Sequence, residues 1–224
     1  MDFAKFVSLL EERALFFPRL SSLADPLEGF LSKPTVEEFV SVPESLPDSQ
    51  RPERERVGRY NLAFMRRTRE LIYVSAWHLN EHESAAMWRL YLKSDEGIAV
   101  SSTVGQMKTA FSQSRHRVYI GKVIYVDFEQ DPTPADNILY LAMHKRRSFE
   151  HEREVRAIVF EPPATSNEGR PGILVPVDLS QLLTSVYVAP HCPVWVYDLV
   201  QKVIRRYGLK VDVWHSGLDQ KPLY

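Results

Sequence analysis

The chain has 224 residues, a length that allows one or two domains. Hydrophobic residues make up 44% and charged residues 25%, the balance of a globular protein, which excludes a mainly disordered chain, a collagen-like repeat and a coiled coil. Lys and Arg total 28 and Asp and Glu total 29, so the net charge of -1 by itself favours neither a nucleic acid nor a membrane as partner.

Cysteine and glycine usage narrows the class further. The single Cys192 cannot form an internal disulfide, and no apolar run reaches the ~18 residues of a membrane span, so we expect a cytoplasmic protein. The nine glycines are scattered and form neither G-x-G-x-x-G nor G-x-x-x-x-G-K-[ST]. Rossmann dehydrogenases, P-loop NTPases and protein kinases are therefore excluded.

The first half of the chain predicts alternating helices and strands. Helical spacing of apolar residues and N-capping patterns predict helices over 3–10, from Thr35 onward, over 53–70, and after Asn80 through Tyr91. Runs of β-forming residues predict strands over 14–17 and 71–77. The proline-rich segment 41–52 predicts a loop.

The second half continues this interleaving without a regular βαβ order. We expect strands over 98–102, 117–127, 155–160, 173–177, 184–189 and 210–214, and a loop over 162–172. Helices are predicted over 104–112, from Asp136 to Arg147, and from Pro193 to Gly208. Together these elements predict a single α+β domain over 1–224, with one principal mixed or antiparallel sheet flanked by helices.

Three clusters could carry chemistry, and the first is Asp25-Pro26-Leu27-Glu28-Gly29. Asp and Gly are common turn residues, so a structural turn is the favoured interpretation. We expect Asp25 or Glu28 to hold the strand 14–17 against a central strand. A binding role for the two carboxylates is the alternative.

The second cluster is aromatic and spans the end of one strand and the following helix. It contains Trp77 and His78, then Ser84, Trp88 and Tyr91, which share one helical face. Two tryptophans and a tyrosine can stack a planar ligand ring. Packing in the hydrophobic core explains the same pattern equally well.

The third cluster is the charged run 145–156. At strand spacing, Glu150, Glu152, Glu154 and Arg156 project from one face. Carboxylates crowded in this way repel each other, so the pKa of at least one of them is expected to rise. The run is therefore a candidate catalytic edge. A solvent-exposed face with Glu–Arg pairs is the alternative.

Two further patterns concern metals and phosphates. His78 and His82 are four residues apart, but Leu79 follows the first histidine where the zinc-peptidase motif requires Glu, and there is one cysteine, so we expect no metal. Residues 51–69 hold seven arginines and two glutamates, a pattern that fits either a phosphate-facing helix or a solvated one.

The three clusters together resemble a large bacterial family labelled as a domain of unknown function. Its members carry D-P-[FL]-E-G near the start, a central M-W-x-x-Y followed by a glycine and a strand, and a late E-x-E-x-R strand. Here these stand at 25–29, at 87–91 with Gly97, and at 152–156, and the tail 213–222 is also similar. Family members often carry a further strand ahead of the position of Met1, so a pocket that includes this strand would be incomplete here.

This resemblance implies a distant likeness to the ADP-ribosyltransferase fold, whose members include toxins and defence effectors. It implies NAD as a substrate and a nucleic acid or a protein as acceptor. Glu154 would be the catalytic carboxylate and Glu152 would orient the acceptor. Trp77, Trp88 and Tyr91 would stack the nicotinamide, and Arg146 would contact a phosphate. The alternatives are a non-enzymatic nucleotide- or protein-binding module and a metal-independent nuclease.

Overall fold

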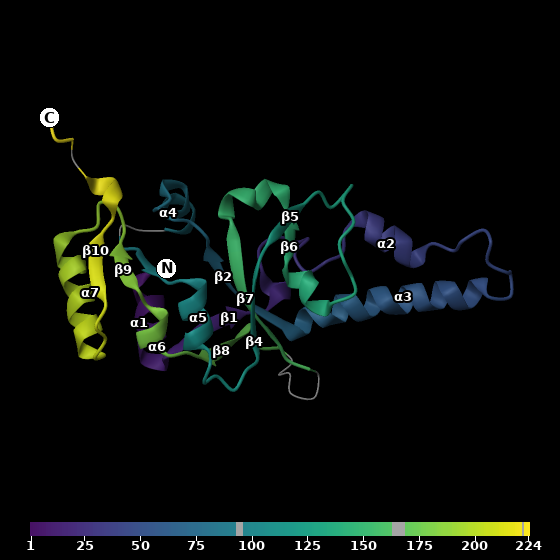
Figure 1. Cartoon of the computed structure of the whole chain (residues 1–224), viewed down its shortest axis with the longest axis horizontal. Coiled ribbons are helices and arrows are strands. Elements are labelled where there is room, and N and C mark those ends of the chain that lie inside the picture. Colours follow the sequence, from purple (N-terminus) through teal and green to yellow (C-terminus); the bar gives the residue numbers. More distant parts are fainter. Residues whose placement is uncertain (93–95, 163–168, 221) are drawn as a thin grey trace. The chain divides into compact units, whose positions relative to one another are not determined.

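A computed structural model describes residues 1–92, 96–162, 169–220 and 222–224 (Figure 1). Helices and strands are interleaved along the chain, which confirms the predicted α+β class. Among the described residues the strands are distributed over small sheets of two or three strands, where the sequence predicted one principal sheet. The elements also separate into two compact units: unit 1 comprises 1–16, 80–116 and 174–224, and unit 2 comprises 17–79 and 117–173.

Unit 1 is built around the three-stranded sheet β10-β9-β3. In that sheet β9 pairs in parallel with β10 and antiparallel with β3. The helix α7 packs along β10 and buries Val196, Val200 and Ile204 (Figure 1). The elements of this unit are α1 (Phe3–Glu12), α4 (Ala85–Tyr91), β3 (Ile98–Ser101), α5 (Val104–Ala110), α6 (Leu179–Leu182), β9 (Ser185–Val188), α7 (Val194–Arg206), β10 (Asp212–His215) and the 3-10 helix Gly217–Asp219.

Two further strands pair with each other. These are β1 (Ala14–Pro18) and β8 (Gly172–Pro176), which form a two-stranded sheet. The predicted loop 162–172 precedes β8 and falls partly outside the described residues.

Unit 2 contains the antiparallel sheet β2-β7-β4, the parallel pair β5-β6 and a helical hairpin. In the hairpin α3 runs beside the shorter α2 (Figure 1). The elements are the 3-10 helix Leu20–Ser22, α2 (Lys33–Val40), α3 (Arg51–Thr68), the 3-10 helix Arg69–Leu71, β2 (Ile72–His78), β4 (Val118–Lys122), β5 (Ile124–Val126), the 3-10 helix Ile138–Ala142, β6 (His144–Arg146), the 3-10 helix Arg147–Glu152 and β7 (Glu154–Phe160).

The core of unit 2 lies against one face of its central sheet. Ile72 and Val74 of β2 and Ile158 of β7 project from this face and pack with Leu20 and Leu141. The same face continues toward the start of β7, where Arg156 and Glu154 follow Ile158 at intervals of two residues. The polar residues at that end of β7 therefore share a buried face with the hydrophobic core.

Several local predictions were wrong because competing capping or packing interactions decide the structure. The helix predicted from Asp136 to Arg147 is replaced by a short 3-10 helix capped by Asn137 and by β6. Thr35 does not cap α2; it lies inside that helix, buried, and donates a hydrogen bond to the carbonyl oxygen of Thr133 at 2.9 Å. The single strand predicted over 117–127 is interrupted between β4 and β5.

No helix in the described part of the chain combines the length and apolar character that crossing a bilayer requires.

Candidate functional site

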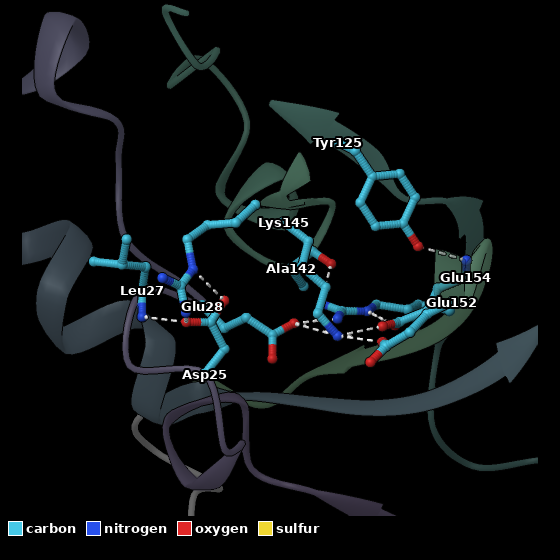
Figure 2. Close-up of polar contacts among 10 residues, drawn as sticks. Asp25, Leu27, Glu28, Tyr125, Ala142, Lys145, Glu152 and Glu154 are labelled. Atoms are coloured by element: carbon cyan, nitrogen blue, oxygen red, sulfur yellow. Dashed lines mark hydrogen bonds and ion pairs between the residues drawn. The ribbon is translucent and has the colours of Figure 1, made fainter. Parts of the chain in front are cut away.

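The candidate site is a buried cluster of charged side chains in unit 2, and its members come from one turn and three secondary-structure elements. Glu28 belongs to the turn 25–29, Lys145 to β6, Glu152 to the end of the 3-10 helix Arg147–Glu152, and Glu154 and Arg156 to the start of β7. All five residues are buried. Figure 2 shows how the side chains of Glu28, Glu152 and Glu154 approach from these segments.

Lys145 lies among the three carboxylates. Its Nζ is 2.5 Å from Glu152 Oε2, 2.6 Å from Glu154 Oε1 and 3.9 Å from Glu28 Oε1 (Figure 2). The same ammonium group is 4.7 Å from the centre of the Phe149 ring, within the range of a cation–π contact. Burial alone would lower the pKa of Lys145, but the hydrogen bonds to Glu152 and Glu154 outweigh burial and raise it. Lys145 is therefore held in its charged form.

Arg156 connects the opposite side of the cluster to the backbone. It donates from Nε to Glu154 Oε2 at 2.6 Å, from Nη1 to the carbonyl oxygen of Ala142 at 2.8 Å, and from Nη2 to Glu28. The hydroxyl of Tyr125 accepts a hydrogen bond from the backbone N–H of Glu154 at 2.8 Å. These contacts fix the position of the Glu154 carboxylate between two cations.

The charges of the cluster do not balance when every group is ionised, because three carboxylates face two cations. Burial raises the pKa of Glu152, and its hydrogen bond with Glu154 raises it further, against the effect of Lys145. For Glu154, burial acts upward too, but the hydrogen bond with Glu152 and the charge of Arg156 outweigh it and lower the pKa to about 2. Of these two glutamates, Glu152 is therefore the one that more readily takes a proton, and Glu154 stays ionised.

The backbone conformation of Arg153 explains how the two neighbouring glutamates reach the same cation. The sequence predicted that Glu150, Glu152 and Glu154 lie on one strand, and this was wrong for the first two, which belong to a 3-10 helix. Arg153 has a left-handed conformation with φ 44° and ψ 54°, which ends the 3-10 helix and starts β7. The carboxylates of Glu152 and Glu154 converge from two different elements.

His78 stands beside Glu154 on the adjacent strand. The two residues are paired in the β2–β7 register, so their side chains leave the same face of the sheet. His78 Nδ1 is 2.6 Å from the carbonyl oxygen of Glu152, and because a carbonyl only accepts, Nδ1 carries the hydrogen. In the neutral ring Nε2 then has a free lone pair, and this buried atom has no hydrogen-bond partner within the described residues. In that tautomer Nε2 is a hydrogen-bond acceptor.

The turn 25–29 attaches to this region by a second ion pair. Arg146 donates to Asp25 through Nε at 3.1 Å and through Nη2 at 2.7 Å. Asp25 also orders the turn by accepting a hydrogen bond from the N–H of Leu27 at 3.1 Å, and Gly29 has a φ of 78°. The contacts of Asp25 and Glu28 thus reach β6 and β7. The expected attachment of the strand 14–17 by these two carboxylates was wrong.

This ion pair predicts an asymmetry between its two partners. The Asp25 side chain is 2% exposed, and that of Arg146 is 38% exposed. Asp25→Ala should lower the free energy of unfolding by about 1–3 kcal/mol. The loss stays moderate because the Arg146 guanidinium, which loses its partner, can reach water. Arg146→Ala should lower the free energy of unfolding further, because it leaves the buried Asp25 carboxylate without its cation. Urea unfolding of both variants measures the difference, and an equal or reversed order contradicts it. Unchanged stability with abolished ligand binding would make the turn a binding element.

Of the three aromatic residues that the sequence grouped with Glu154, one lies on the opposite face of its sheet and two belong to unit 1. Trp77 pairs with Val155, not with Glu154, so it projects from the opposite face of the sheet, where its indole N–H donates to Ser75 at 3.1 Å. Trp88 and Tyr91 belong to α4 in unit 1. Trp88 is half-buried and Tyr91 is exposed, and their contact with a nicotinamide ring stays a prediction.

Sequence reasoning missed the roles of Glu28 and Lys145 in the cluster. Glu28 was assigned to a turn, although its carboxylate pairs with an arginine 128 residues away. Lys145 was part of the charged run, but nothing in the spacing distinguishes it from Arg146 and Arg147, whose side chains are far more exposed. The described residues contain no group of three or more His, Cys, Asp or Glu side chains that could hold a metal ion.

Comparison of the chain with protein-family models, with curated proteins and with solved structures found no match. The family resemblance inferred from the motifs, and the roles that it implies, accordingly stay predictions.

Proposed function

We propose that the protein is an ADP-ribosyltransferase-like enzyme that cleaves NAD and transfers ADP-ribose to a macromolecular acceptor. The observation that carries this proposal is the pair of adjacent buried carboxyl groups with opposite pKa shifts. Glu154 is held ionised, with a pKa of about 2, and Glu152 has a raised pKa. Pairs of titratable groups whose environments separate their pKa values are characteristic of catalytic sites.

The proposed reaction uses the charge of Glu154. The bond between the nicotinamide nitrogen and the ribose breaks, and its electron pair stays with the nicotinamide, which leaves neutral. Positive charge then develops on the ribose in an oxocarbenium-like state, and a carboxylate bonded to the ribose 2-hydroxyl stabilises that charge. Because Arg156 and Lys145 fix Glu154 before the substrate binds, the carboxylate does not need to reorganise during the reaction.

The second half of the reaction needs a proton acceptor. A hydroxyl or amine of the acceptor attacks the anomeric carbon, forms the new bond and loses a proton. His78 Nε2, with its free lone pair beside Glu154, takes this proton in the proposed mechanism. Glu152 donates its hydrogen bond to Glu154 and orients the acceptor. Arg146 can contact a phosphate of NAD only if its hydrogen bonds to Asp25 break first.

A second candidate function is a non-enzymatic nucleotide- or protein-binding module. It is favoured by the extent of internal pairing in the cluster, where both oxygens of Glu154 accept hydrogen bonds from Lys145 and Arg156. Charges that are buried and satisfied in this way also occur in purely structural networks. In this alternative the ion cluster supports the fold and the ligand binds elsewhere.

Incubation of the full chain with NAD labelled on its adenylate phosphate separates the two candidates. The enzyme should release free nicotinamide and transfer the label to protein, DNA or RNA added as acceptor. The His78→Gln variant should bind NAD but transfer the label more slowly, by about 10²-fold or more for a lost general base. Binding of NAD without release of nicotinamide favours the binding module. Absence of both binding and release contradicts the enzymatic proposal.

A further inference from the structure

The helix α3 is the most basic element of unit 2, and its charges fall into two groups. It carries six arginines and two glutamates between Arg51 and Thr68. Both glutamates are paired within the helix: Glu53 accepts from Arg56 at 2.7 and 2.8 Å, and Glu55 accepts from Arg59 at 3.4 Å. The negative charges of α3 are thus taken up in its first half.

The remaining arginines differ in what they contact. Arg51 donates to the carbonyl oxygens of Glu44 and Leu46, and Arg54 donates to those of Glu38 and Phe39. These two arginines attach α3 to the preceding segment. Arg66 and Arg67, in the last turn, are exposed, and their side chains make no hydrogen bond or ion pair with any residue that the structure describes.

Aromatic side chains accompany the unpaired arginines on the same helix. Tyr60 is 67% exposed and Phe64 is 49% exposed. Tyr60, Phe64 and Arg67 stand at i, i+4 and i+7 and therefore share one face of the helix. This face lies opposite Gly58, which is so close to α2 that an added Cβ would clash with the carbonyl oxygen of Phe39.

We infer that this face of α3, defined by Tyr60, Phe64 and Arg67, binds single-stranded nucleic acid together with the neighbouring Arg66 of the last turn. Exposed aromatic rings offer stacking surfaces to unpaired bases, and arginines at the same surface neutralise phosphates. The charge excess of the helix is positive, which suits a polyanion. A duplex fits less well, because its bases are already stacked on one another and offer no free faces to the two exposed rings. The inference goes beyond the proposed reaction and does not depend on it.

Fluorescence anisotropy of the full chain with a labelled single-stranded DNA oligonucleotide of about 16 nucleotides tests the inference. The wild-type protein should bind the strand more tightly than a duplex of the same sequence. Tyr60→Ala and Phe64→Ala should each weaken binding roughly tenfold, the loss expected for one stacked base. Arg66→Gln and Arg67→Gln should each weaken binding and should each reduce the slope of log affinity against log salt by about 0.7, the value for one phosphate that is no longer neutralised.

A matched control on the same helix is Arg56→Gln, which removes an equal charge at an exposed position already paired with Glu53. It should change the affinity much less than either arginine of the last turn. Circular dichroism establishes that each variant keeps its helices. Affinity that is unchanged in the ring variants, or equal for strand and duplex, overturns the inference. Equally effective displacement of the strand by polyglutamate would assign the face to an acidic protein partner and would also overturn it.

Discussion

Arg156→Met should lower the free energy of unfolding by about 3–5 kcal/mol, the cost of removing one partner from a buried ion pair. The Arg156 side chain is 1% exposed and donates hydrogen bonds to the carboxylates of Glu28 and Glu154 and to the carbonyl oxygen of Ala142. Methionine fills a similar volume but removes the donor to Glu28, to Glu154 Oε2 and to the carbonyl oxygen of Ala142. Urea unfolding, followed by circular dichroism, measures the loss.

Two control variants make this expectation specific to the buried pairing. Arg147→Met removes an arginine that is 64% exposed and paired at the surface with Asp131, and should change stability by at most about 0.5 kcal/mol. The double variant Arg156→Met/Glu28→Leu should recover part of the loss, since it removes a stranded carboxylate along with the cation. If Arg156→Met lowers the free energy of unfolding by less than about 1 kcal/mol, the value of an exposed ion pair, the buried pairing does not contribute to stability as expected.

Glu154→Gln should reduce the turnover of NAD by about 10²-fold or more, while NAD binding changes little. A neutral amide still accepts a hydrogen bond, but it cannot match the electrostatic stabilisation that a carboxylate offers to a developing positive charge. The variant should keep its fold, because the two remaining carboxylates then balance the charges of Lys145 and Arg156. Single-turnover release of nicotinamide measures the chemical step.

The matched control is Glu129→Gln, the same change at an exposed glutamate paired with Lys33, which should leave turnover unchanged. Trp88→Ala should instead weaken binding, because stacking acts on ground state and transition state alike. If wild-type and Glu154→Gln proteins release nicotinamide at the same rate, Glu154 is not the catalytic carboxylate. If neither releases any, the binding module is the better description.

The pH dependence of stability gives the Glu154→Gln variant a second readout, independent of catalysis. Because folding lowers the pKa of Glu154 from 4.5 to about 2, the ionised form stabilises the folded state. That contribution is complete above about pH 4.5 and is lost as the pH falls toward 2. The stability advantage of the wild type over the variant should therefore shrink across this range, as urea unfolding at about pH 5 and about pH 3 would measure.

The sequence predicted elements well where local chemistry decides them. The helix α7 follows Pro193, carries an apolar stripe and ends near Gly208, whose φ of 72° suits a left-handed stop. Its existence and approximate limits follow from neighbouring residues alone. The strand β7 was also recognised, since four of its seven residues, Val155, Ile158, Val159 and Phe160, are β-formers.

The site was predicted less completely because it depends on contacts between distant residues. The spacing E-x-E correctly singled out Glu152 and Glu154 as neighbours in space, but for the wrong reason, since a left-handed residue and not strand alternation brings them together. Strand alternation did apply to β2, and it places Trp77 on the face opposite Glu154. Periodicity cannot identify which lysine of a charged run is buried, because burial depends on the packing of the whole unit.

The attachment of Glu28 to Arg156 has a consequence for the order of folding. Unit 2 is formed by two chain segments, 17–79 and 117–173, and the 37 residues between them belong to unit 1. The pairs Glu28–Arg156 and Asp25–Arg146 join these segments across 128 and 121 residues, so each requires the closure of a long loop. Until the second segment docks, a desolvated Glu28 has no cation to compensate its charge. The ion cluster thus penalises half-assembled forms of unit 2 and favours the arrangement in which both segments are in place, at the expense of slow assembly.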